Sequence, residues 1–144
     1  MDIFSSIETA TLKFEPGSSF EYANTGCVVV KEIAESATLK DYAKLMEDEI
    51  FDPAHMTSSG VARSSTLATP AKGYKDATQT DIVNIDFPIE NVDGAGSVYS
   101  TVEDLYKLDR ALYTDSLLSK EMKALMLTQH VAEKYSYGWF VRER

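Results

Sequence analysis

The stretch Phe14-Glu15-Pro16-Gly17-Ser18-Ser19-Phe20-Glu21-Tyr22-Ala23-Asn24-Thr25-Gly26 decides how the rest of this sequence is interpreted. Its Glu15-Pro16-Gly17-Ser18 portion is typical of a turn, because proline presets φ and glycine allows a positive φ. A helix is expected to follow from Thr25 to Ser36, with Asn24 or Thr25 as its cap. Considered by itself, Tyr22-Ala23-Asn24 is a turn segment, and a catalytic role is the minority interpretation.

The next helix has the strongest apolar periodicity in the chain. Thr38 and Asp41 fit a capping box, and Pro53 is expected to end the helix. Its apolar residues fall at helical spacing on one face: Leu39, Tyr42, Ala43, Met46 and Ile50.

Capping residues predict two more helices nearer the C-terminus. Ser100 with Glu103 forms a second capping box, and Ser119 is expected to cap a helix from Lys120 to Thr128. The helix after Ser100 carries a predicted buried stripe of Leu105, Leu108 and Leu112. Further predicted elements are a helix over Asp2 to Leu12 and extended pieces near Gly73-Tyr74-Lys75 and Ile82-Val83-Asn84-Ile85.

The aromatic segment Tyr135 to Val141 is expected to be a strand. The sequence offers no obvious sheet for it, which suggests that the chain is part of a longer protein. An unpaired apolar strand tends to pair with another chain. We therefore expect this strand to pack back on the helices, to pair between copies, or to be poorly ordered.

The composition excludes several classes of function. Lys plus Arg is 14 and Asp plus Glu is 23, so the formal net charge is 14 − 23 = −9. A surface of that sign repels phosphate backbones, so no nucleic-acid partner is expected. No apolar run approaches the roughly 20 residues that span a bilayer, and the start of the chain lacks a signal-peptide pattern. The compartment stays open, because a secreted, periplasmic or membrane-attached parent would carry its signal upstream.

Motifs for a complete active site or a metal site are missing from the sequence. Neither a G-x-S-x-G elbow nor a Ser-x-x-Lys pair occurs. His55 and His130 stand alone, and no Cys/His cluster has ligand spacing, so no metal and no cofactor are expected. Gly94-x-Gly96 lacks the third glycine and the preceding apolar strand of a dinucleotide fingerprint.

Four ordered segments nevertheless resemble the serine β-lactamase and D-alanyl-D-alanine peptidase superfamily, in its class C-like branch. The first is Phe14 to Gly26, in which Tyr22-Ala23-Asn24 resembles the family's Tyr-Ser/Ala-Asn motif. The others are Ile50 to Met56, Gly94 to Leu105 and Tyr135 to Phe140. Ala54-His55 replaces the family's Leu-Gly and Ser136 stands where glycine is common, which affects loop geometry more than chemistry.

The resemblance implies a fold and an incomplete site. The fold expected is mainly α with a few short strands, the helical subdomain of the family's α/β fold, in a truncated form. Residues 1–134 would form that subdomain, and residues 135–144 would begin the returning sheet strand. Tyr22 would be the proton-transfer tyrosine and Asn24 the orienting amide, with Gly94, Ala95, Gly96 and Ser97 near the cleft wall.

The same resemblance places the missing machinery outside this chain. The family's nucleophile segment would precede Met1, and its third motif, on a strand, would follow Arg144. A phenol with an ordinary pKa near 10 needs nearby cations to act as a base at neutral pH. In the family those cations are lysines that this sequence lacks, so Tyr22 is expected to stay protonated and the chain to be inactive alone.

Two interpretations remain open for the function, and the ordered motif matches make a third, an unrelated helical interaction protein, the least favoured. One is a fragment of a serine hydrolase whose partner is the remainder of the parent polypeptide, and whose full-length form takes a small-molecule or peptide substrate. The alternative is a non-catalytic binding or regulatory module derived from the same fold. The substrate stays open between β-lactams, cell-wall peptides, esters and D-amino-acid amides.

Overall fold

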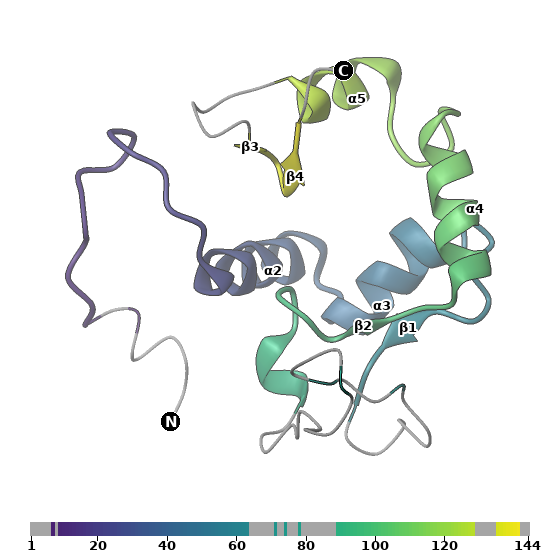
Figure 1. Cartoon of the computed structure of the whole chain (residues 1–144), viewed down its shortest axis with the longest axis horizontal. Helices are drawn as coiled ribbons and strands as arrows, with labels where there is room; N and C mark the ends of the chain where they lie inside the picture. The colour runs from purple at the N-terminus through teal and green to yellow at the C-terminus, as the bar shows by residue number, and fades with distance from the viewer. Residues whose placement is uncertain are drawn as a thin grey trace. The chain divides into compact units, whose positions relative to one another are not determined.

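The computed structural model describes residues 7, 9–63, 71, 74, 78, 89–128 and 135–141. They form two compact units. One consists of Met1–Tyr22 with Leu127–Arg144, and the other of Ala23–Met126. Figure 1 labels the helices and strands of both, and each unit is described by itself below.

The first long helix, α2, spans Asn24–Thr38. The expected cap is wrong by at least one position: Ala23 is the N-cap, and no side chain caps the helix there. Asn24 is therefore the first residue of the helix, and its side-chain amide does not cap the first turn. The helix ends at Leu39, which adopts a left-handed conformation (φ 57°, ψ 26°) and donates its N–H to the Glu35 carbonyl at 2.8 Å.

The strongly periodic segment forms two consecutive short helices. An α-helical part, α3, spans Tyr42–Met46, and a π-helical part, η1, continues it over Glu47–Phe51. The predicted capping box is corrected: Asp41 alone caps α3 by accepting from the Lys44 N–H at 2.9 Å, while the Thr38 hydroxyl donates to Ala34 O within α2. The wider π turn brings Phe51 into the interior, where it is 5% exposed.

Two short strands pair with each other in the unit Ala23–Met126. The strands β1, Gly60–Val61, and β2, Val98–Tyr99, pair antiparallel with Gly60 opposite Tyr99. A short 3-10 helix, η2, spans Ile89–Val92 and leads into the glycine turn that precedes β2. A Cβ built on Gly60 would lie 2.6 Å from the Tyr99 hydroxyl, so a larger residue at this position would displace the Tyr99 ring.

The last two helices are α4, Val102–Leu112, and α5, Lys120–Leu127. The N-cap of α4 lies one residue later than expected: Thr101 caps the helix by accepting from the Asp104 N–H. The predicted stripe is only partly buried, since Leu108 packs on the core but Leu105 is 53% exposed. The predicted cap of α5 is confirmed, with Met122 N–H donating to Ser119 Oγ at 3.3 Å.

The core of this unit is small and lies where η1 and the following turn meet α4. Its buried residues are Phe51, Ala54 and Met56. Six partly buried apolar residues pack against them: Met46, Ile50, Val61, Leu108, Ala111 and Leu117. His55, between two of the buried residues, adopts a left-handed conformation (φ 58°), which explains why glycine suits this position in the resembling motif.

In the other unit, the aromatic segment is a hairpin instead of a single strand. The strands β3, Tyr135–Ser136, and β4, Trp139–Phe140, pair antiparallel. Tyr137 and Gly138 both have positive φ (41° and 91°), as a type I′ turn requires. The expectation of a strand without a partner is therefore wrong, because the segment supplies both strands.

Several expectations fall outside the described residues. They are residues 2–6 and 8 of the helix predicted over Asp2 to Leu12, the extended pieces near Gly73 and Lys75 and over Ile82 to Ile85, and His130. The described end of that first segment, Thr9 to Leu12, is not helical, so the predicted helix is wrong there. The division into 1–134 and 135–144 stays a prediction. Across the described ranges, no helix has the length and apolar character needed to cross a membrane.

Candidate functional site

Tyr22 belongs to a group of aromatic rings in the unit that contains the hairpin. Its ring lies edge-to-face with Tyr135, with 6.1 Å between centroids. Tyr135 also contacts Phe20 at 5.0 Å and Phe140 at 5.1 Å. Two segments that are distant in sequence thus hold one ring surface together, while Tyr22 remains 52% exposed. Aromatic pairs of this geometry contribute about 0.5–1.5 kcal/mol each beyond the area they bury.

Asn24 begins α2 in the other unit. Its side chain is exposed, and the helix is capped by the backbone of Ala23 without a side-chain hydrogen bond. The Asn24 amide therefore makes no capping hydrogen bond to the helix. A carboxamide carries both a donor and an acceptor, so it can orient an amide-containing substrate from the start of α2.

The Gly94 turn packs directly on α2. Gly94 has φ +83°, and a Cβ built on it would lie 2.8 Å from the Cys27 carbonyl oxygen and 2.8 Å from Lys31 Cβ. The contact with Cys27 lies one helical turn after Asn24. Any other residue at position 94 would push the turn off the helix, so this glycine allows the close approach.

Ser97, at the end of the same turn, points inward. It is 1% exposed, and its Oγ has no hydrogen-bond partner among the described residues. Its carbonyl accepts from the Ala62 N–H at 2.6 Å, next to the β1–β2 pairing. Of the four glycine-turn residues proposed as a cleft wall, Gly94 and Ser97 are thus occupied with internal packing, while Gly96 is exposed.

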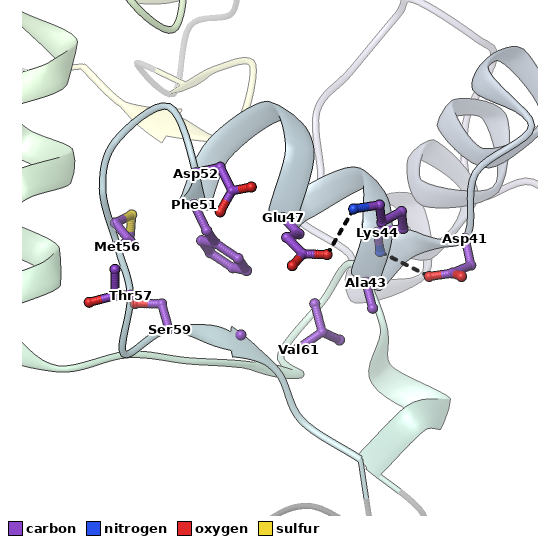
Figure 2. A pocket seen from close by; sticks show the side chains of 11 residues that line it. Asp41, Ala43, Lys44, Glu47, Phe51, Asp52, Met56, Thr57, Ser59 and Val61 are labelled. Atoms are coloured by element: carbon purple, nitrogen blue, oxygen red, sulfur yellow. Dashed lines mark hydrogen bonds and ion pairs between the residues drawn. The ribbon is translucent and has the colours of Figure 1, made fainter.

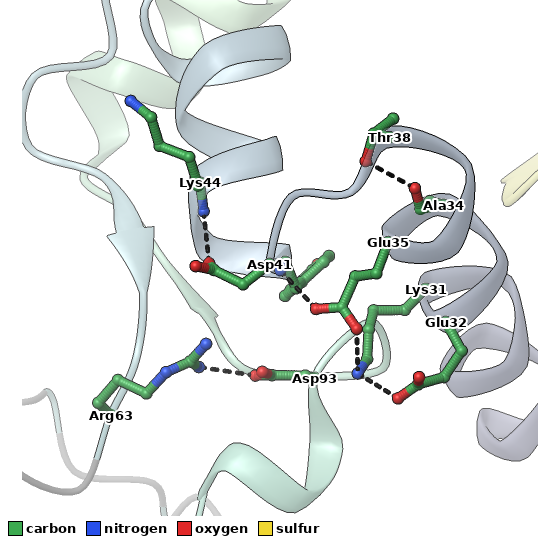
Figure 3. A network of polar contacts seen from close by, with 10 residues as sticks. Lys31, Glu32, Ala34, Glu35, Thr38, Asp41, Lys44, Arg63 and Asp93 are labelled. Carbon is green, nitrogen blue, oxygen red and sulfur yellow. Dashed lines mark hydrogen bonds and ion pairs between the residues drawn. The ribbon is translucent and has the colours of Figure 1, made fainter.

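A polar network that the sequence did not reveal holds this turn and α3 against α2 (Figure 3). Glu35 accepts from the Tyr42 N–H at 2.5 Å and from Lys31 Nζ at 3.0 Å. Arg63 pairs with Asp93 at 2.9 Å on the other side of the turn. These side chains come from segments up to 62 positions apart, counting from Lys31 to Asp93, so no local spacing could have predicted the network.

The charges of this network affect two neighbouring groups. Burial lowers the pKa of Lys31, but hydrogen bonds to Glu32 and Glu35 outweigh it, so the net pKa is raised. Burial and the Asp93 carboxylate raise the pKa of the Tyr42 phenol, against the opposing backbone hydrogen bond from Gly94. Lys31 is therefore charged, and Tyr42 neutral, at physiological pH.

Asp104 is the most buried charged side chain described, at 1% exposure. One of its carboxylate oxygens accepts from the Ser58 N–H at 2.6 Å and from Ser59 Oγ at 2.8 Å. The other pairs with Lys107 Nζ at 2.7 Å, and Lys107 also donates to His55 O at 2.8 Å. The Lys107 hydrogen bond holds the pKa of Asp104 below its usual range, against the opposing effect of burial. Asp104 thus joins α4 to the loop before β1, and its role is structural.

A cavity of about 460 Å³ opens between α3, η1 and the chain entering β1 (Figure 2). Its apolar lining is Phe51, Met56 and Val61, and its charged groups include Asp41 and Lys44. Asp41 caps α3, and Lys44 pairs with Glu47 at 3.2 Å and Asp48 at 2.8 Å. These charged side chains therefore stabilise α3 and η1. Hydrogen bonds to Asp48 and Glu47 raise the pKa of Lys44. Within the described ranges, no group of three or more His, Cys, Asp or Glu side chains is arranged to hold a metal ion.

Comparison with known proteins finds a family model that matches the whole chain and relatives that are named as penicillin-binding proteins. A family model described as Beta-lactamase matches residues 1–144. The chain is 28% identical over 141 residues to the penicillin-binding protein PbpX of Bacillus subtilis, covering 97% of this chain and 36% of that protein. It is 27% identical to penicillin-binding protein 4* of the same organism, covering 90% of this chain and 33% of that protein.

Solved structures that resemble the chain include a penicillin-binding protein and a D-amino acid amidase. The structure of a penicillin-binding protein from Bacillus halodurans superposes with a TM-score of 0.75 at 30% identity, covering 91% of this chain and 42% of the other. A D-amino acid amidase from Ochrobactrum anthropi follows with a TM-score of 0.68 at 27% identity, covering 88% of this chain and 38% of the other. The chain thus spans about a third of the length of the curated relatives it matches.

Proposed function

Because the chain belongs to the Beta-lactamase family, we propose that it carries the tyrosine–asparagine element of an acyl-transfer site of a serine hydrolase. The observation that carries this proposal is the Tyr22-Ala23-Asn24 motif with both functional side chains accessible. Tyr22 is half exposed beside its aromatic partners, and Asn24 is exposed in the first turn of α2. The Asn24 side chain does not cap the helix, and about half of the Tyr22 side chain stays exposed despite its contact with Tyr135.

The proposed reaction is the one that the resemblance implies. A serine attacks the substrate carbonyl and forms an acyl-enzyme, which water then hydrolyses. Tyr22 would transfer the proton between the nucleophile and the leaving group, and Asn24 would orient the substrate amide. A positioned acid–base group of this kind contributes about 10²–10⁴-fold to the rate.

We propose further that this chain alone is inert. Its sequence contains no Ser-x-x-Lys motif, so it offers no activated serine next to a lysine. A tyrosine cannot replace that serine, so no acyl-enzyme should form. The substrate class of the whole protein is proposed as an amide or ester, since the similar proteins include penicillin-binding proteins and a D-amino acid amidase.

A chimera tests the proposed roles of Tyr22 and Asn24. This chain would replace the matching segment of the Bacillus halodurans penicillin-binding protein, and labelling of the chimera by a fluorescent penicillin would be followed. We expect the chimera to be acylated, and Tyr22→Phe and Asn24→Ala to slow acylation by about 10²-fold or more. Tyr113→Phe, at an exposed tyrosine of α4's end, is the matched control and should leave the rate unchanged.

Three results would contradict the proposal. A chimera that folds and acylates equally well without the Tyr22 hydroxyl would exclude proton transfer by this residue. For the chain alone, nitrocefin and p-nitrophenyl acetate should give no burst; a product burst stoichiometric with protein would show that it has a nucleophile of its own. A folded chimera that binds penicillin without acylation would favour the non-catalytic binding module.

A further inference from the structure

A second cavity of about 530 Å³ lies between the turn after η1 and the outer side of α4. Both walls belong to the unit Ala23–Met126. The apolar part of its lining includes Pro53, Ala54 and Ala111. The pocket is therefore shaped by the same turn that holds the left-handed His55.

The charged side chains that line this pocket are all basic in the described part of the chain. They are Lys107 and Arg110, with the imidazole of His55 beside them and the hydroxyls of Thr114 and Ser116 at one end. The whole chain has a net charge of −9. Lys107 and Arg110 are each paired with an aspartate, Asp104 and Asp109, so an anion binds here only by replacing one of these carboxylates.

The Arg110 guanidinium is held in place by two aromatic rings of its own helix. It lies 5.6 Å from the Tyr106 centroid and 4.7 Å from the Tyr113 centroid. Stacking of this kind orients the planar fork that binds carboxylates through two hydrogen bonds. The two rings therefore favour orientations in which the guanidinium lies near their faces.

Arg110 already binds a carboxylate in this structure. Its Nε and Nη2 donate to Asp109 Oδ2 at 3.0 and 2.6 Å. Both side chains are more than half exposed, so the pair is weak and exchangeable. Lys107, in contrast, is committed to Asp104 and to the His55 carbonyl, and it fixes the wall of the pocket.

We propose that this pocket binds a small organic carboxylate with a flat apolar body. The carboxylate replaces Asp109 on the Arg110 fork, and the apolar body covers Ala54 and Ala111 beside the Tyr106 ring. The guanidinium, released from Asp109, supplies both the orientation and the charge complementarity. The site uses none of the residues assigned to acyl transfer.

The test is a titration of the whole chain with benzoate, followed by amide and arginine Nε–H shifts in ¹H–¹⁵N NMR spectra. We expect saturable shifts confined to Arg110 and its neighbours Ala54, Ala111 and Thr114. Arg110→Gln should weaken binding at least about tenfold, because it removes the charged fork. Asp109→Asn should tighten binding by about 1.5- to 5-fold, because it removes the competing carboxylate.

Matched controls separate this site from general charge effects. Lys40→Gln removes one positive charge that pairs with Asp48 and Glu49, and it should leave benzoate binding unchanged. Benzyl alcohol, which has the ring without the charge, should produce no saturable shifts, and phenyl phosphate distinguishes a carboxylate site from a general anion site. Linear shifts, equal binding of benzyl alcohol, or an Asp109→Asn variant with unchanged affinity would overturn the proposal.

Discussion

Leu39 occupies a backbone conformation that suits glycine, at the point where α2 ends. Its φ of 57° is left-handed, and its side chain is 93% exposed. A left-handed conformation costs a residue with a Cβ about 1–2 kcal/mol, and an exposed leucine gains nothing by burial in return. His55 has the same conformation between the buried Ala54 and Met56. Both positions are places where the chain retains local strain.

Leu39→Gly is therefore expected to stabilise the unit Ala23–Met126. Glycine removes the strain but adds flexibility to the unfolded chain, so the net gain should be about 0.5–1 kcal/mol. That corresponds to a rise of roughly 2–6 °C in the midpoint of thermal unfolding, measured by circular dichroism at 222 nm.

Leu39→Ala is the control for this substitution, since it keeps the Cβ and removes only the exposed apolar atoms. Its midpoint should stay close to that of the unchanged protein. An equal gain in both variants would show that the exposed leucine, and not its backbone, was the source of the effect.

At the scale of elements, the contact between α4 and the loop before β1 depends on one carboxylate. Asp104 accepts hydrogen bonds from Ser58 and Ser59 of the loop and pairs with Lys107 of its own helix. The lowered pKa of Asp104 means that its charged form is stabilised by folding. Such a group stabilises the protein above its unfolded pKa, near 3.9, and this contribution disappears as pH falls through the folded pKa.

We therefore expect Asp104→Asn to lower the unfolding midpoint at pH 7 by roughly 5 °C or more. The difference between the variant and the unchanged protein should shrink steadily as the pH falls below about 4, where the carboxyl of the unchanged protein becomes protonated. Thermal unfolding followed between pH 7 and pH 2 measures both effects. A difference that does not depend on pH would mean that the shape of the side chain matters here and its charge does not.

Glu103→Gln is the matched control for that experiment. It removes a carboxylate from the adjacent, exposed position in the first turn of the same helix. The interaction of an exposed carboxylate with the helix dipole is worth only about 0.3–1 kcal/mol, so its effect should be smaller.

At the scale of the whole molecule, the two units differ in what holds them together. Ala23–Met126 has a core of Phe51, Ala54 and Met56 and the polar network around Glu35. The unit that contains the hairpin is held by the ring contacts of Phe20 and Tyr22 with Tyr135. An isolated two-stranded hairpin is only marginally stable in water, so these contacts matter to its order.

A shortened chain of residues 23–126 is therefore expected to fold by itself. Its helical circular dichroism signal should be retained, and its unfolding midpoint should lie within about 3 °C of that of the whole chain, because the core lies within these residues. A non-cooperative transition would show that residues 1–22 or 127–144 are needed to complete the core.

The sequence by itself determined the family and the order of most described elements. The ordered motifs from Phe14 to Phe140 are local patterns, and local patterns can be identified in a sequence without knowledge of the fold. The ends of the elements were less certain: the cap expected at Asn24 or Thr25 is Ala23, which offers no capping side chain, and the cap expected at Ser100 is the neighbouring Thr101.

Only the tertiary structure decided what Asp104, Glu35 and Gly94 do. Asp104 bonds to residues 46 and 45 positions earlier, and Gly94 packs on the carbonyl of Cys27. Such contacts leave no periodicity in the sequence, because their partners meet only when the elements pack. The Tyr22-Ala23-Asn24 motif shows the same division. Its residues were recognisable from the sequence, whereas the exposure of Tyr22 and the uncommitted amide of Asn24 depend on how the chain folds.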